Sequence, residues 1–200
     1  MNMLIDELPV NVVIDGKSYD INSNFRNSAI FELMMADNEL DDNEKIIKAL
    51  ELYYPDIPEN INIAVEKILW FYRCGKDIIT SKSSSAKGKS TQIYDFNFDD
   101  DYIYSAFLDQ YGIDLQDIEF LHWWKFKALF KSLKEDNEIV KIMGYRSMDL
   151  NKIKDKDEKA RYKKMKELYK IQGHISKDET EKLDNIKNAL LNGGDLSKLL

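Results

Sequence analysis

The stretch "DLQDIEFLHWWKFKALF", residues 114–130, is the densest aromatic and apolar part of the chain. It contains two of the three tryptophans and one of only two histidines in the protein. Its centre, "HWW" at residues 122–124, has two interpretations: the heart of an active site or the core of a helix. The spacing of the surrounding apolar residues favours a helix that is buried on most sides.

At about 100° per residue, the stretch predicts one helix that starts with Asp114 as its N-cap and ends near Leu133. Leucine and isoleucine side chains cluster on one side of this helix, and His122 falls among them. A lone histidine on an apolar face is more often a neutral core residue with one hydrogen bond than a catalyst. Pairing of His122 with Cys74 is the catalytic alternative, and one such pair is a weak signal.

The two tryptophans of this helix fall on different sides. Trp123 is expected in the core, whereas Trp124 lies outside the central apolar stripe, near Lys131. Exposed tryptophans often anchor interfaces. Trp124, Lys127 and Lys131 are therefore the candidate partner-binding residues, and packing of Trp124 against another part of the same chain is the alternative.

The composition predicts a single soluble domain, with or without an appendage. The chain has 200 residues, of which 44% are hydrophobic and 12% aromatic, enough for a real core. Three prolines and eight glycines are few and favour long helices. The single cysteine argues against a secreted, oxidised protein. No signal peptide and no apolar run of about 20 residues is visible, so a cytoplasmic protein without a membrane segment is expected.

The predicted fold is mainly α, with seven or eight helices and a small N-terminal β-hairpin. Asp15-Gly16 lies between two β-prone runs and predicts a tight turn between strands at 10–14 and 17–21. Capping boxes at Asp41–Glu44 and Ser176–Glu179 mark two helix starts. Helical periodicity covers these segments: 22–38, 41–54, 59–75, 99–112, 114–133, 136–150, 156–171 and 176–191.

Changes in composition divide the chain. Residues 1–79 are expected to hold the hairpin and the first helices, and residues 95–150 a second helical half. Residues 80–94 include "TSKSSSAKGKSTQ", which is small, polar and basic, and predict a flexible linker loop. Residues 151–200 are expected to form charged C-terminal helices. The interpretation that accompanies this division is one compact domain over 8–150 with a C-terminal extension.

No catalytic, cofactor-binding or metal-binding motif emerges from the sequence. Consecutive side chains on a helix point about 100° apart, so Asp99, Asp100 and Asp101 are expected to start a helix rather than to share an ion. The chain has no HExxH, no paired cysteines, no Walker loop and no GxGxxG. A protein that is not an enzyme, with no cofactor and no metal, is therefore expected.

Charge is unevenly distributed along a chain whose formal net charge is −7. An acidic chain is a poor nucleic-acid binder. Residues 95–119 carry 8 acids and no base, whereas residues 151–172 carry 9 bases and 4 acids. These blocks predict docking of one subunit on the next, and two solvated faces that never meet are the alternative. The candidate self-association residues are Asp99, Asp100, Asp101, Lys156, Lys159, Lys163, Lys164 and Lys166.

Several stretches together resemble a known family. They are "LPVNVVIDGKSYDINSNFRNSAIFE" at 8–32, "FYRCG" at 71–75, the long block from "DFNFDDD" to "KSL" at 95–133, and "YRSMDL" at 145–150. They resemble a tail-region protein of siphophages and prophages of Gram-positive bacteria, over roughly residues 8–170. The gene of that family typically lies between those for the major tail protein and the tape measure protein.

The resemblance implies a tail assembly chaperone that binds the tape measure protein, with the tail tube protein as a second partner. Such a protein acts in the cytoplasm of the bacterial host, associates with itself, and is not expected in the mature virion. No catalytic residue, membrane partner or nucleic-acid partner comes with the resemblance. The alternative is a structural tail-completion or connector subunit that stays in the virion.

Overall fold

The structure, a computed structural model, describes residues 2–76 and 92–171. Within them the chain forms a two-stranded antiparallel hairpin and seven helices, so the predicted mainly α class with an N-terminal hairpin is confirmed. The predicted helix at 176–191 and the predicted loop at 80–91 lie outside the described residues. The elements are β1 (Asn11–Ile14), β2 (Lys17–Asp20), α1 (Phe25–Ala36), α2 (Asp42–Tyr53), α3 (Ile61–Tyr72), α4 (Asp100–Tyr111), α5 (Trp123–Lys131), α6 (Glu138–Ser147) and α7 (Lys156–Leu168).

The hairpin turn and several helix ends follow from local sequence. Asp15 and Gly16 have φ of 49° and 80°, the positive pair that a tight hairpin turn requires. The side chain of Asp41 accepts the backbone N–H of Glu44, whose carboxylate accepts the N–H of Asp41, and this capping box starts α2. Gly112 ends α4 in the left-handed conformation, with φ of 65°. The predicted turn, the predicted capping box and the predicted end of the helical segment 99–112 are confirmed.

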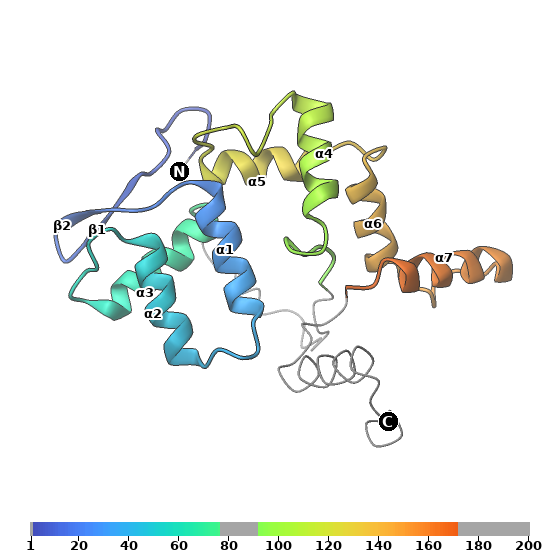
Figure 1. Ribbon diagram of the computed structural model, residues 1–200, viewed down its shortest axis with the longest axis horizontal. Helices are drawn as coiled ribbons and strands as arrows, with labels where there is room; N and C mark the ends of the chain where they lie inside the picture. Colours follow the sequence, from blue (N-terminus) through green and yellow to red (C-terminus); the bar gives the residue numbers. More distant parts are fainter. Residues whose placement is uncertain (1, 77–91, 172–200) are drawn as a thin grey trace, which may run out of the picture.

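α5 connects the two ends of the molecule through its contacts with α1 and α4. The hairpin and α1, α2 and α3 form one end of the molecule, and α5 lies across it and contacts α1 (Figure 1). α4 contacts both α5 and α6, and α7 packs on α6 and projects from the body at the other end. Within the described ranges, no helix is long and apolar enough to cross a membrane.

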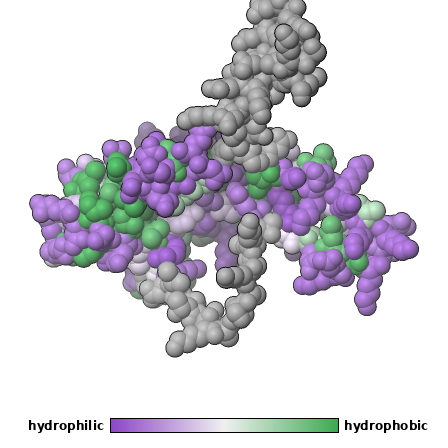
Figure 2. All heavy atoms as spheres, turned by 90° about the horizontal axis from the view of Figure 1, so that it is seen from below, coloured by the Kyte–Doolittle hydropathy of each residue, from purple (hydrophilic) through white to green (hydrophobic). Residues whose placement is uncertain are grey.

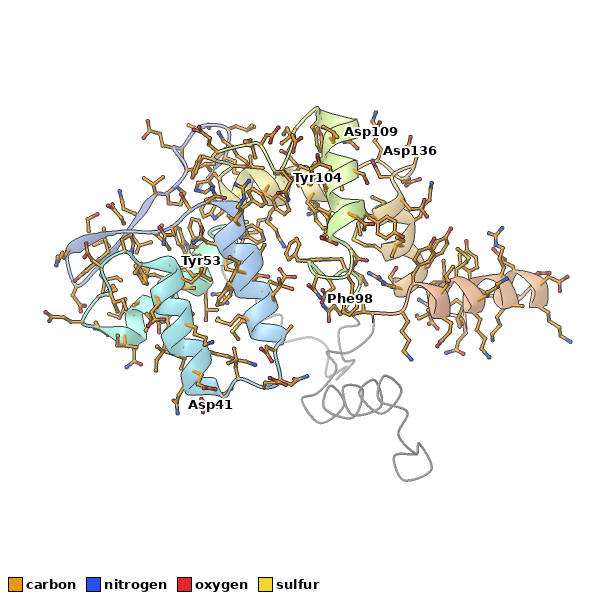
Figure 3. All side chains as sticks on the ribbon, in the orientation of Figure 1. Asp41, Tyr53, Phe98, Tyr104, Asp109 and Asp136 are labelled. Carbon is orange, nitrogen blue, oxygen red and sulfur yellow. The ribbon has the colours of Figure 1, made fainter. Side chains whose placement is uncertain are left out.

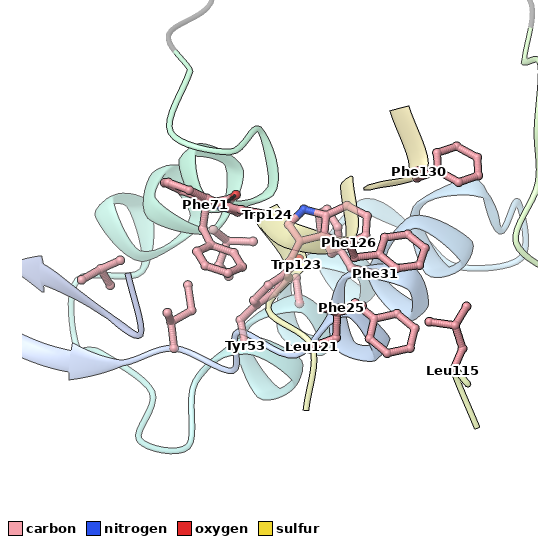
Figure 4. Packing of buried hydrophobic residues seen from close by; sticks show 14 of the residues in the cluster. Phe25, Phe31, Tyr53, Phe71, Leu115, Leu121, Trp123, Trp124, Phe126 and Phe130 are labelled. Carbon is pink, nitrogen blue, oxygen red and sulfur yellow. Dashed lines mark hydrogen bonds between the residues drawn. The ribbon is translucent and has the colours of Figure 1, made fainter. Parts of the chain in front are cut away.

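The core is rich in stacked aromatic rings, and its centre is Phe126 of α5. This side chain is 1% exposed and lies parallel to the rings of Phe25 and Phe107, each with a centroid 4.9 Å away. Figure 4 shows Trp123, Phe126 and Phe25 packed together where α5 meets α1. A Phe-to-Ala change in such a core costs about 3–5 kcal/mol. The densest stretch of the sequence therefore supplies the part that joins the helices.

The start of α5 differs from the prediction. Asp114 does not begin this helix; its carboxylate instead accepts the N–H of Gln116, 2.8 Å away, in a separate turn. Residues just before Trp123 are extended because they pair with the chain that leads into α1. The N–H of Phe25 donates to the carbonyl of Leu121, and the N–H of Trp123 donates to Ser23, both at 2.8 Å. A continuous helix from 114 would break these two bonds.

The described end of the predicted linker belongs to the body of the protein. Tyr94 is half-buried, and its ring meets Phe96 edge-on at 5.4 Å and Phe130 at 5.2 Å. Tyr94, the last residue of the predicted 80–94 linker, therefore packs on α5.

Candidate functional site

The two tryptophans of the "HWW" tripeptide, at the start of α5, donate hydrogen bonds to backbone carbonyls at the end of α3. The indole Nε1–H of Trp124 donates to the carbonyl of Phe71 at 2.7 Å, and that of Trp123 donates to the carbonyl of Tyr72 at 2.9 Å. The last carbonyls of a helix have no partner within the helix. Trp123 therefore supplies a partner for the carbonyl of Tyr72, and Trp124 adds a second donor to that of Phe71. Each bond contributes about 1 kcal/mol net.

The end of α3 is shaped to receive this contact. Cys74 and Gly75 both have positive φ, 58° and 68°. The N–H of Cys74 donates to the carbonyl of Phe71 and that of Gly75 to the carbonyl of Trp70, the pattern of a Schellman motif. A Cβ on Gly75 would lie 2.7 Å from the indole of Trp124. Glycine at this position is required by both the backbone and the close approach.

His122 is a structural residue with both ring nitrogens occupied. It is 3% exposed and is the N-cap of α5, where its Nδ1 accepts the N–H of Trp124 at 3.1 Å. Nε2 lies 3.0 Å from the carbonyl of Pro9 and therefore carries the proton. Burial lowers the pKa of His122 and keeps the ring neutral, and its two engaged nitrogens leave none free to accept a proton from a substrate. Burial raises the pKa of Cys74, which disfavours the thiolate.

Trp124 does not lie on an exposed flank, so the prediction of its location is wrong. The side chain is 2% exposed and packs edge-on against Trp70, with ring centroids 5.6 Å apart. The alternative, packing within the same chain, is what the structure shows, because the end of α3 covers that side of α5. Of the three candidate partner-binding residues, Lys131 is exposed.

Lys127 is held in an aromatic box rather than free for a partner. Its Nζ lies 5.0 Å from the ring centroid of Trp123 and 5.9 Å from that of Tyr72, and it donates to the hydroxyl of Tyr94 at 3.3 Å. The hydroxyl of Tyr72 donates to Glu32 of α1. Burial is the main cause that raises the pKa of both Tyr72 and Tyr94. The box ties α1, α3 and α5 together.

Asp99 is the buried half of an ion pair, which corrects its assignment to a self-association surface. It is 1% exposed, and its two oxygens accept from Arg146 at 2.6 and 2.9 Å. Arg146 also donates to the carbonyls of Tyr169 and Ile93. The pair therefore joins the start of α4 to α6, to the end of α7 and to the segment before α4.

The other predicted self-association residues divide by exposure. Asp100 and Asp101 lie exposed in the first turn of α4. Lys166 is half-buried and donates to the carbonyl of Met148 at 2.9 Å, so it belongs to the fold. The remaining lysines are exposed on α7: Lys156, Lys159, Lys163 and Lys164.

An apolar groove between α1 and α2 is the surface that the sequence reasoning missed. It encloses about 580 Å³ and is lined by Ile30, Leu33, Met34, Asp37, Leu40, Lys48, Glu51 and Leu52, which define the α1–α2 groove. Figure 2 shows apolar side chains on the surface at this end of the molecule, surrounded by hydrophilic ones. The sequence did carry a signal for this groove, because α1 has apolar residues on two of its sides. A helix with a single buried face needs apolar residues on one side only.

Residues 2–76 and 92–171 contain no group of three or more histidine, cysteine, aspartate or glutamate side chains that could hold a metal ion. The described part of the chain thus presents structural clusters and open helix surfaces.

The fold and these surfaces define a small, mainly helical protein with an N-terminal hairpin. Residues 4–171 match the family described as Bacteriophage Gp15 protein, and the chain belongs to this family. The expected membership in a bacteriophage family is confirmed. A search of curated proteins and a search of solved structures returned no match.

Proposed function

We propose that the chain is a non-catalytic tail assembly protein, a chaperone that binds the tape measure protein before the tail tube closes around it. The bacteriophage family supports a phage role, and the resemblance to a tail-region protein supports this particular one. The observation that carries the proposal is the α1–α2 groove, an open apolar surface of a size suited to a helix. Amphipathic helices bind apolar surface grooves of this kind.

The groove has the chemistry that an amphipathic helix needs. Leu33 and Leu52 are half-buried and form part of its floor, and Ile30 stands at its edge, 53% exposed. Lys48 and Glu51 supply opposite charges from α2. An amphipathic helix binds such a groove through apolar residues spaced three or four apart, and charged rim groups then set its register.

A shallow groove suits a chaperone better than a permanent subunit. A long helical client exposes an apolar stripe that aggregates unless it is covered. A groove of this size covers only a short part of that stripe, so many copies would bind along it, each weakly. Weak binding at each position allows tail tube subunits to displace the chaperone, which acts in the host cytoplasm and leaves no copy in the virion.

The first test is co-purification of the tagged full-length chain with the tape measure protein from cells that express the tail genes. Ile30→Glu places a charge in the groove and should lower the recovered tape measure protein about tenfold or more, since burial of such a side chain contributes about 1.5–3 kcal/mol. Ile61→Glu is the matched control, because Ile61 is also exposed on a helix, 40%, outside the groove.

Mass spectrometry of purified phage particles tests the chaperone role against its competitor. Absence of the chain from particles, together with tape measure protein in the eluate, supports a chaperone. Presence of the chain in particles would replace this proposal with a structural tail-completion or connector subunit. Equal loss of tape measure protein with both glutamate variants would remove the groove from the proposal.

A further inference from the structure

The outer side of α7 is an open basic surface. The inner side of this helix packs on α6, where the rings of Tyr162 and Tyr169 lie 6.1 and 5.9 Å from that of Tyr145. No residue of α7 is buried, and Leu168 is 67% exposed. The outer side, which we term the basic face of α7, consists of Lys159, Ala160, Lys163, Lys164, Glu167 and Leu168.

The outer side of α4 carries two acidic residues, Asp101 and Asp109, and no basic one. Its buried residues point toward the core, and the opposite side carries Leu108, 43% exposed, between acidic residues. Tyr104 and Asp109, labelled in Figure 3, stand at the two edges of this side of the helix. We term it the acidic face of α4, and it consists of Asp101, Tyr104, Ser105, Leu108 and Asp109.

We infer that the basic face of α7 in one copy binds the acidic face of α4 in a second copy. Both faces repeat at three and four residues, the spacing that lets two helices pack along their length. Their charges are opposite, and residues 95–119 contain no base that would oppose the lysines. Each face also offers one exposed leucine and one small residue, Ala160 or Ser105, which permits close approach.

The two faces cannot meet within one copy. α4 and α7 both pack against α6, so both turn their inner sides toward it and their outer sides away. The partner must therefore be another molecule, and an acidic helix with an exposed leucine is present on every copy. The self-association that the charge blocks predict is thus assigned to the basic face of α7 and the acidic face of α4. Asp99 and Lys166 belong to neither face, because their side chains are engaged in the fold.

A charge swap tests this pairing on the full-length chain. Lys163→Glu with Lys164→Glu reverses the basic face, and Ser105→Lys with Asp109→Lys reverses the acidic face without touching the first-turn acids of α4. Each double variant alone should self-associate about tenfold or more weakly in sedimentation at low salt, and a mixture of the two should regain association. Self-association of the unmodified chain should also weaken at 0.5 M salt, where charges are screened within about 4–5 Å.

Lys125→Glu with Lys134→Glu is the matched control, because it changes the net charge equally on exposed lysines elsewhere. This control should associate as the unmodified chain does. An unmodified chain that stays monomeric at about 100 μM, or a mixture that fails to regain association, would overturn the inference. The proposed binding of the tape measure protein depends on the α1–α2 groove and not on α7. Co-purification of the tape measure protein with the Lys163→Glu, Lys164→Glu variant therefore tests the proposed function separately from self-association.

Discussion

At the scale of single residues, Gly75 decides how closely α3 and α5 approach. It lies at positive φ, and the space where a Cβ would stand is filled by the indole of Trp124. The same indole donates to Phe71 and so has little freedom to move. Because glycine has no Cβ, Gly75 permits both the turn after α3 and the close contact with the indole of Trp124.

Gly75→Ala should lower the free energy of unfolding by about 2–4 kcal/mol, from the backbone conformation and the displaced indole together. Gly112→Ala is the control, because Gly112 also has positive φ, 65°, but no atom lies within 4 Å of its added Cβ. That variant should lose only the backbone part, about 1–2 kcal/mol. Urea unfolding measures both, and equal losses would show that the contact with Trp124 costs nothing.

His122 should make stability depend on pH. Its pKa is lowered in the folded protein because the ring is buried, so the unfolded chain binds a proton first as pH falls. The contribution of His122 to the free energy of unfolding is therefore fully present above the unfolded pKa of about 6.5. It declines below that pH, by at most about 1.4 kcal/mol per pH unit for one proton. His122→Asn keeps a capping side chain without the titration. Urea unfolding between pH 7.5 and 5.5 should show a smaller decline for this variant, and identical declines would exclude His122 as the cause.

The sequence predicted the core position of Trp123 and of His122 but not that of Trp124. A helical wheel shows one apolar stripe, and Trp124 falls outside it. The wheel does not show that α3 ends against this second side of α5, where the carbonyl of Phe71 accepts the indole N–H. A tryptophan outside the stripe can thus be buried when another helix needs a cap.

At the scale of elements, one buried ion pair joins the start of α4 to α6 and to the segment before α4. Asp99 is the N-cap residue of α4, yet its side chain makes no capping bond and binds Arg146 instead. Burial of both groups means that neither can lose its partner without leaving a charge in the core.

Arg146→Met should therefore lower stability by about 3–5 kcal/mol, because Asp99 would remain buried and unpaired. Asp99→Asn combined with Arg146→Met should cost less than the sum of the two single changes, since the pair acts as a unit. Lys141→Met is the control, because its ion pair with Glu138 is exposed and contributes only about 0.3–0.5 kcal/mol. Additive losses in thermal or urea unfolding would contradict the coupling.

Element boundaries were predictable where local chemistry sets them and not where distant chain does. The capping box of α2 and the glycine after α4 are visible in the sequence and confirmed. The start of α5 is set by hydrogen bonds from Phe25 to Leu121 and from Trp123 to Ser23, across about 100 residues of sequence. Helical periodicity continues through Asp114 and carries no sign of them.

At the scale of the whole molecule, α7 differs from the other helices in burial. Each helix from α1 to α6 has at least one residue with no exposed surface, whereas no residue of α7 is buried. Opening of a helix held by few buried contacts costs less than global unfolding.

Amides of α7 should thus exchange with deuterium faster than those of α3 at low protein concentration, by about a hundredfold or more for a difference of 3 kcal/mol. Exchange followed by mass spectrometry at about 5 μM measures this, and equal protection of the two helices would contradict it. Leu168, 67% exposed, lies in the segment expected to exchange fastest.

The mainly α class and the hairpin were predictable because each element carries its own periodicity, caps or turn residues. The exposed surfaces were harder to predict from the sequence. Charge counting placed an acidic block before and within α4, yet it could not separate Asp99, which is buried, from Asp101, which is exposed. The groove between α1 and α2 depends on how two helices pack, which no single segment encodes.

The contacts of Gly75 and Tyr94 have a practical consequence for handling the protein. Gly75 rests on Trp124, and Tyr94 on Phe130, so the chain is held to α5 both before and after residues 77–91. An affinity epitope spliced into that interval would leave both anchors in place. The protein could then be captured through its middle, with neither terminus nor the faces proposed for binding altered.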